Sequence, residues 1–79
     1  MENMKEQVGK ILVEVKKSVE SHLSDDGLVS GGVLDSLDIM NLIMKLEEGF
    51  DIEIDPEDVL SENFDSVDAI VALVNKCKS

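Results

Sequence analysis

The stretch GVLDSLDIMNLIMKLEEGF, residues 32–50, decides the fold. Its apolar residues recur three and four positions apart, which is the spacing of one face of an α-helix. Asp35 stands where a helix N-cap belongs, and Asp38, three residues later, can complete a capping box. The stretch therefore predicts a helix from Ser36 to about Phe50. The residues of its core stripe are Ile39, Leu42, Ile43, Leu46 and Phe50.

Three further segments of the chain also predict helices. Helical spacing of apolar residues predicts a first helix from Glu2 to about His22. Pro56, whose fixed φ suits a first helical position, predicts a short helix that ends near Ser61. The last helix is expected from Ser66 to about Lys76, with Asp65 as its N-cap. Its predicted buried stripe is Val67, Ile70, Val71 and Val74.

Together these segments predict an all-α fold. We expect a small four-helix bundle with three main helices, one short helix and a long first loop that ends at Asp35. A chain of 79 residues is enough for one domain, residues 1–79, and leaves no room for a buried enzyme cleft.

The charge of the chain restricts its partners. Eighteen acidic and seven basic residues give a formal charge of −11, which repels nucleic acid and anionic membranes. Six of the seven lysines lie outside residues 23–62, where Lys45 is the only base. We therefore expect partners with basic patches that meet the acidic middle of the chain.

The cysteine, histidine and hydropathy patterns indicate a reducing cytoplasmic setting. Cys77 is the only cysteine, so the chain forms no internal disulfide, and His22 has no second histidine or cysteine to complete a zinc site. No apolar run reaches the length of a membrane span, and no signal peptide is evident. We expect a cytoplasmic monomer that does not insert into membranes.

The helix over residues 36–50 has a second apolar face. Leu37, Met40 and Met44 are three and four residues apart and are not needed by the core stripe. They are bordered by acids at Asp38, Glu47 and Glu48. An apolar centre with a charged rim is typical of a binding surface, and methionine suits contact with several partners. The alternative is that this helix is central and buried nearly all round.

Ser36 is the candidate for covalent chemistry. It is the first residue of the predicted helix and follows a glycine-rich loop. A phosphate attached there would meet unpaired backbone N–H groups and the positive end of the helix dipole. The motif repeats at Asp65-Ser66-Val67-Asp68, and motif chemistry alone does not decide between the two serines.

The chain resembles acyl carrier proteins over nearly its whole length. The resemblance rests on GVLDSLD at 32–38, Leu42, LEE at 46–48, FDIEI at 50–54, Pro56 and FDSVDAI at 64–70. It implies that Ser36 receives 4′-phosphopantetheine from coenzyme A through a phosphopantetheinyl transferase. It further implies that Asp35 helps the transferase to hold its metal ion, and that Leu37 and Asp38 adjoin the attachment site. The implied docking surface for partner enzymes consists of Leu37, Met40, Asn41, Met44, Glu47 and Glu48.

The resemblance implies a carrier that serves enzymes and is not itself an enzyme. We expect it to present acyl or aminoacyl thioesters to partner enzymes, as in fatty acid synthesis or related lipid or secondary-metabolite pathways. Asn41, Lys45 and Gly49 depart from the fatty-acid-synthesis pattern and make the helix less acidic. A D-alanyl or peptidyl carrier of a dedicated pathway is therefore an alternative. A helical adaptor without a prosthetic group is another.

A calcium-binding loop and an enzyme are the remaining alternatives. Asp51, Glu53, Asp55, Glu57 and Glu62 match the ligand spacing of an EF-hand, but Pro56 occupies the position that needs glycine. The acids thus indicate weak divalent binding and no specific metal site. No pair of residues combines a nucleophile with an evident base, which argues against an enzyme.

Overall fold

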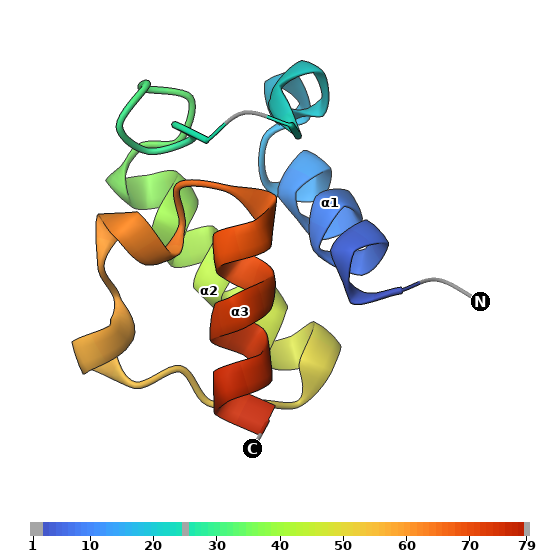
Figure 1. Ribbon diagram of the computed structural model, residues 1–79, viewed down its shortest axis with the longest axis vertical. Helices are drawn as coiled ribbons and strands as arrows, with labels where there is room; N and C mark the ends of the chain where they lie inside the picture. Colours follow the sequence, from blue (N-terminus) through green and yellow to red (C-terminus); the bar gives the residue numbers. More distant parts are fainter. Residues whose placement is uncertain (1–2, 25, 79) are drawn as a thin grey trace.

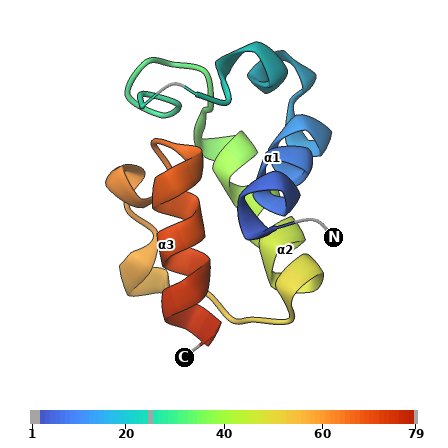
Figure 2. The same cartoon turned by 45° about the vertical axis from the view of Figure 1, so that its right-hand side comes forward.

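The computed structural model describes residues 3–24 and 26–78 of the chain, and helices are its only regular elements there. In order these are α1 (Met4–Val15), η1 (Lys17–His22), α2 (Ser36–Phe50), η2 (Pro56–Asp58), η3 (Ser61–Asn63) and α3 (Val67–Lys78), where η marks a short 3-10 helix. The predicted all-α fold is confirmed. Figures 1 and 2 show the loop before α2 closing one end of the bundle, with the C-terminus at the opposite end.

The core is aliphatic except for one ring. α1 packs against both α2 and α3, and every long helix contributes to the shared interior. Two leucines of the long loop, Leu28 and Leu34, are as deeply buried as those of the helices. The loop is therefore part of the core as well as a connection. The buried side chains are Val8, Leu12, Val19, Leu28, Leu34, Leu42, Leu46, Ile54, Phe64, Val67, Ile70, Leu73 and Val74.

The first helix is shorter than predicted. It ends at Val15, Lys16 is extended (φ −154°, ψ 109°), and the chain continues as η1. The β-branched and serine residues around the break are weak helix formers. Val19, which lies four residues after Val15 and continues the apolar spacing of the first helix, is buried after the break. The chain thus changes direction at Lys16, and the Val19 side chain still packs in the core.

The predicted short helix from Pro56 to Ser61 is two separate 3-10 turns. Pro56 does begin η2, which Asp55 caps by accepting the N–H of Glu57 at 3.0 Å. Val59 and Leu60 then interrupt the helical backbone, and both side chains are exposed. Without a buried apolar stripe, a segment this short has no packing energy to hold a continuous helix.

The last helix begins one residue later than predicted. Ser66, and not Asp65, is its cap, because the Ser66 Oγ accepts the N–H of Ala69 at 3.0 Å. The helix extends to Lys78, so Leu73 joins the buried stripe while Val71 is only partly buried.

The second apolar face of α2 is exposed. Leu42 and Leu46 are fully buried, whereas Leu37, Met40 and Met44 are 65%, 63% and 60% exposed. The remaining stripe residues, Ile39, Ile43 and Phe50, pack against the core and are partly buried. The alternative that α2 is buried nearly all round is therefore wrong. None of the described helices is both long and apolar enough to cross a bilayer.

Truncating Leu46 and Met44, two residues apart on α2, should reduce stability by very different amounts. Leu46→Ala should lower the free energy of unfolding by about 2–5 kcal/mol, because it leaves a cavity in a closed core. Met44→Ala, two residues away on the exposed face, should change it by less than about 0.5 kcal/mol. Urea denaturation followed by circular dichroism measures both. Equal losses would show that the methionine face supports the core.

Candidate functional site

Ser36 is the first residue of α2 and is exposed at the end of the bundle. The two acids that flank it form the predicted capping box. The Asp35 Oδ1 accepts the N–H of Asp38 at 2.9 Å, and the Asp38 Oδ2 accepts the N–H of Asp35 at 3.1 Å. These reciprocal bonds fix the angle at which the chain enters α2, and with it the position of the Ser36 side chain.

Two backbone donors remain at the start of α2. The capping box uses the N–H groups of Asp35 and Asp38, and the N–H of Ile39 begins the helical ladder. Within the part of the chain that the structure describes, the N–H groups of Ser36 and Leu37 have no partner. They lie at the positive end of a 15-residue helix. A phosphate group on Ser36 would therefore meet donors and a favourable dipole.

Lys16 connects the end of α1 to this site. Its Nζ lies 3.1 Å from the Asp38 Oδ2, and both side chains are partly buried. Burial would raise the pKa of Asp38, but the Asp35 N–H and the Lys16 ammonium outweigh it and hold that pKa below its ordinary value. The ion pair also neutralises one of two adjacent acids. The sequence did not indicate that Lys16 pairs with Asp38, because the two residues are 22 positions apart.

The two Asp-Ser motifs differ in register by one residue. In the first, Asp35 is the cap and Ser36 lies inside the helix, so the serine hydroxyl has no capping duty. In the second, Ser66 is the cap, and its hydroxyl is occupied by the N–H of Ala69. Ser66 is also partly buried, whereas Ser36 is exposed. An exposed hydroxyl without a capping bond is the better acceptor for a transferred group.

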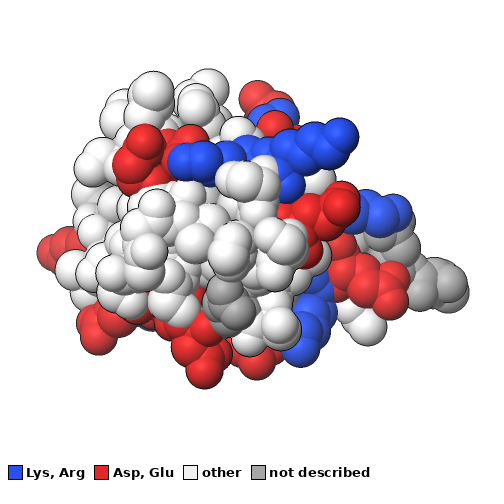
Figure 3. All heavy atoms as spheres, turned by 90° about the horizontal axis from the view of Figure 1, so that it is seen from above, with Lys and Arg blue, Asp and Glu red and all other residues white. Residues whose placement is uncertain are grey.

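Backbone hydrogen bonds within the loop before Ser36 shape its turn. Gly31 donates to the carbonyl of Gly27 at 2.7 Å, and that carbonyl leaves no space for a side chain on Gly31. Gly32 has φ +82°, which favours glycine. Leu34 donates to the carbonyl of Leu28 at 2.7 Å and closes the turn. Figure 3 shows this end of the molecule as a mostly uncharged surface with charged side chains around it.

The acids that border the exposed face of α2 differ in their surroundings. Asp38 is paired with Lys16. Glu47 is partly buried, and its Oε2 accepts the N–H of Ile54 at 3.0 Å, which ties down the chain after α2. Glu48 is exposed. The structural bond of Glu47 was not foreseen from the sequence.

Asn41 lies on the exposed side of α2 next to a small crevice. The crevice has a volume of about 240 Å³ and is bordered by α1 and α2. Its lining includes Asn41, Met44 and Glu48, three of the residues predicted to contact partners. Lys45 also lines it and forms an ion pair with Glu14 at 3.7 Å.

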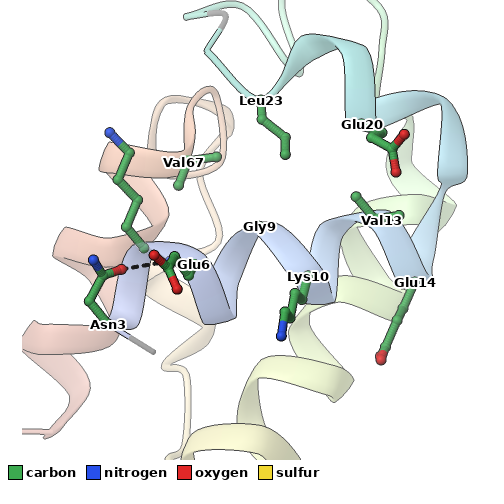
Figure 4. A pocket seen from close by; sticks show the side chains of 10 residues that line it. Asn3, Glu6, Gly9, Lys10, Val13, Glu14, Glu20, Leu23 and Val67 are labelled. Atoms are coloured by element: carbon green, nitrogen blue, oxygen red, sulfur yellow. Dashed lines mark hydrogen bonds between the residues drawn. The ribbon is translucent and has the colours of Figure 1, made fainter. Parts of the chain in front are cut away.

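A larger groove lies away from the predicted site. It has a volume of about 810 Å³ and runs along α1 beside η1, and Figure 4 shows Leu23 and Val67 above Gly9. Its lining combines apolar side chains such as Leu23 with charged ones such as Glu6, and none of the residues predicted for attachment or docking takes part in it.

Two of the acids after α2 have structural partners. Asp55 caps η2, and the Asp58 Oδ1 lies 2.7 Å from the Lys76 Nζ. Over residues 3–24 and 26–78, no group of three or more His, Cys, Asp or Glu side chains is arranged to hold a metal ion. The structure therefore gives no support to the calcium-loop alternative.

Comparison with known proteins identifies the protein family of the chain. A family model described as "Phosphopantetheine attachment site" matches residues 6–74. The chain is 35% identical over 77 residues to the acyl carrier protein of Buchnera aphidicola subsp. Baizongia pistaciae, covering 96% of each. It is 36% identical over 76 residues to that of Buchnera aphidicola subsp. Schizaphis graminum, covering 95% of this chain and 94% of that protein. An acyl carrier protein homolog of Mycoplasmopsis pulmonis is 32% identical over 66 residues, covering 84% of this chain and 88% of that protein.

The chain therefore belongs to the acyl carrier protein family. Members of this family are carriers, and their prosthetic group is 4′-phosphopantetheine. The start of α2 fits a phosphate-linked group, because it combines an exposed hydroxyl with two unpartnered N–H groups among the described residues.

The Lys16–Asp38 pair predicts a pH-dependent contribution to stability. The pKa of Asp38 is lowered in the folded state, so its contribution is present above the unfolded value and is lost as the pH falls below about 4. The difference in unfolding free energy between wild type and Asp38→Asn should be largest near neutral pH. It should shrink as the pH falls below about 4. Urea denaturation across this range measures it. Glu48→Gln, at an exposed carboxylate of the same helix, should give a small difference throughout; a similar pH trend there would contradict the assignment to Asp38.

Proposed function

We propose that this chain carries acyl or aminoacyl groups as thioesters on 4′-phosphopantetheine attached to the Ser36 Oγ. The observation that supports Ser36 most directly is the register of the two serine motifs. Asp35 caps α2 and frees the Ser36 hydroxyl, while Ser66 uses its own hydroxyl as a cap. When bound, the group supplies a terminal thiol that forms the thioester.

The residues around Ser36 have separate roles in this proposal. The Ser36 Oγ forms the bond to phosphorus, and the transferase removes the hydroxyl proton while the nucleotide part of coenzyme A leaves. The N–H groups of Ser36 and Leu37 stabilise the resulting phosphodiester. Lys16 offsets the charge of Asp38, which reduces repulsion between the attachment site and the anionic donor. We expect Asp35 to help the transferase hold its metal ion, as the family resemblance implies.

The proposed partners bind the exposed face of α2. Leu37, Met40 and Met44 form its apolar centre, since the core does not use them. Fatty acid or related lipid synthesis is the first pathway to test, because the relatives are named acyl carrier proteins. A D-alanyl or peptidyl carrier is the second, and it is favoured by Asn41 and by the Lys45–Glu14 pair, which reduce the negative charge on this side of α2.

Phosphopantetheine should attach at one serine. Wild type incubated with coenzyme A and a broad-specificity transferase should gain one phosphopantetheine by intact mass. Ser36→Ala should abolish the gain, and Ser66→Ala should retain it because its hydroxyl serves the helix cap. Loss of modification in Ser66→Ala alone would move the site to the second motif. An unmodified wild type would favour the adaptor without a prosthetic group.

The docking face should affect transfer without affecting the fold. Met44→Ala should slow loading or acyl transfer by a cognate enzyme and leave the melting temperature close to wild type, because Met44 is exposed. Leu46→Ala, from the core side of the same helix, is the matched control for loss of stability. Transfer rate and melting temperature are measured for both variants. A wild-type transfer rate for Met44→Ala with several cognate enzymes would argue against this face.

A further inference from the structure

Asp65 binds the loop that leads to Ser36. Its Oδ1 accepts the N–H groups of Val29 and Ser30, both at 2.8 Å, and its carbonyl oxygen accepts the N–H of Leu28 at 2.7 Å. Three consecutive N–H groups of the loop therefore converge on one residue beside the start of α3. Figure 2 shows the loop lying over this end of α3.

The capping of α3 does not explain the Asp65 side chain. Ser66 caps the helix, so the Asp65 carboxylate is directed to the loop instead. The Ser30 and Val29 N–H groups lower the pKa of Asp65, which agrees with an ionised carboxylate that accepts two backbone bonds. The Asp-Ser motif at residues 65–66 thus has two functions, one for each residue.

The loop transmits this contact to the start of α2. The carbonyl of Leu28, whose N–H binds Asp65, accepts the N–H of Leu34 at 2.7 Å. Both leucines are buried in the core, and Leu34 directly precedes the Asp35 cap. Between them lie Gly31 and Gly32, which have the largest backbone entropy to lose. Without an external anchor, this glycine-rich segment would sample many conformations.

We propose that Asp65 is a positioning residue for phosphopantetheine attachment, acting through residues 28–34 to hold Ser36 where the transferase can reach it. The inference rests on Ser36 being the attachment site. A loop released from Asp65 populates the competent arrangement for a smaller fraction of the time. The apparent affinity of the transferase for the carrier falls by that fraction, whereas the chemical step in the bound complex is unchanged.

The test compares four variants in transfer from coenzyme A by a broad-specificity transferase. Asp65→Ala should raise the KM for the carrier about tenfold with kcat nearly unchanged. Asp65→Asn should stay near wild type, because both side-chain bonds go to the Oδ1, which an amide retains. Asp65→Glu keeps the charge but moves the oxygen, and it should resemble Asp65→Ala. Ser66→Ala removes the neighbouring cap of the same helix without touching the loop, and its KM should match wild type.

Amide hydrogen exchange on the same proteins provides a second readout. In Asp65→Ala and Asp65→Glu the amides of Leu28, Val29 and Ser30 should exchange faster, while those of Leu73 and Val74 in α3 stay protected. If Asp65→Ala does not fold, Asp65→Glu and Asp65→Asn still separate oxygen position from charge.

The outcomes separate this inference from the proposed function. An unmodified wild type, with Asp65 intact, would refute attachment itself. A modified wild type with unchanged KM in Asp65→Ala or Asp65→Glu would refute only the positioning role. An equal rise in KM for Ser66→Ala would also refute the positioning role, because it would indicate general destabilisation. A raised KM in Asp65→Asn with a normal KM in Asp65→Glu would refute it too, because it would show that only the charge of residue 65 matters.

Discussion

Two carboxylates lie side by side at the start of α2, in a chain whose formal charge is already −11. Asp35 and Asp38 each accept a backbone N–H from the other, and the Lys16 ammonium lies 3.1 Å from Asp38. These charge-assisted bonds offset the repulsion between the two acids. They also satisfy two of the four N–H groups that a helix N-terminus leaves without partners. The other two belong to Ser36 and Leu37, so one constraint sets both the helix start and the chemistry of its first residue.

All three long helices converge on this point. α1 reaches it through Lys16, which sits at the break where the helix becomes extended. α3 reaches it through Asp65 and the loop, whose leucines Leu28 and Leu34 are buried in the common core. An exposed serine is thereby held by buried and hydrogen-bonded neighbours. A functional side chain on a helix is placed more precisely than one on a free loop, provided that the helix start is itself fixed.

The sequence was most informative where the relevant interactions are local. The boundaries of α2, its capping box and its two apolar faces depend on residues three or four positions apart, and all were predicted from spacing. The predicted end of the first helix was wrong, because the helical spacing of apolar residues continues to Val19 although the chain bends at Lys16. The split of the short helix was missed because Pro56 marks a helix start but says nothing about its length.

The errors at the site have a single physical cause. Aspartate and serine are both good N-caps, so the sequence Asp65-Ser66 does not determine which of the two residues caps α3. The contact that decides it spans 35 and 36 positions, to Ser30 and Val29. The same applies to the Lys16–Asp38 pair. Local patterns identify which residues can cap or pair, and only the fold shows which partner each one takes.

The charges around the exposed face of α2 also bear on how partners would find it. Two of the acids that border this face are committed to other contacts, Asp38 to Lys16 and Glu47 to the N–H of Ile54, and Lys45 on the same helix is paired with Glu14. The ion pairs cancel the charges of Asp38 and Lys45, but a backbone N–H donor leaves the formal charge of Glu47 in place, and Glu48 is exposed. Long-range attraction of a basic partner therefore comes from these two acids together with the field of the whole chain, which salt screens over about 10 Å. Recognition then depends on the apolar contacts, and methionine can adapt these to different surfaces at little cost to the fold.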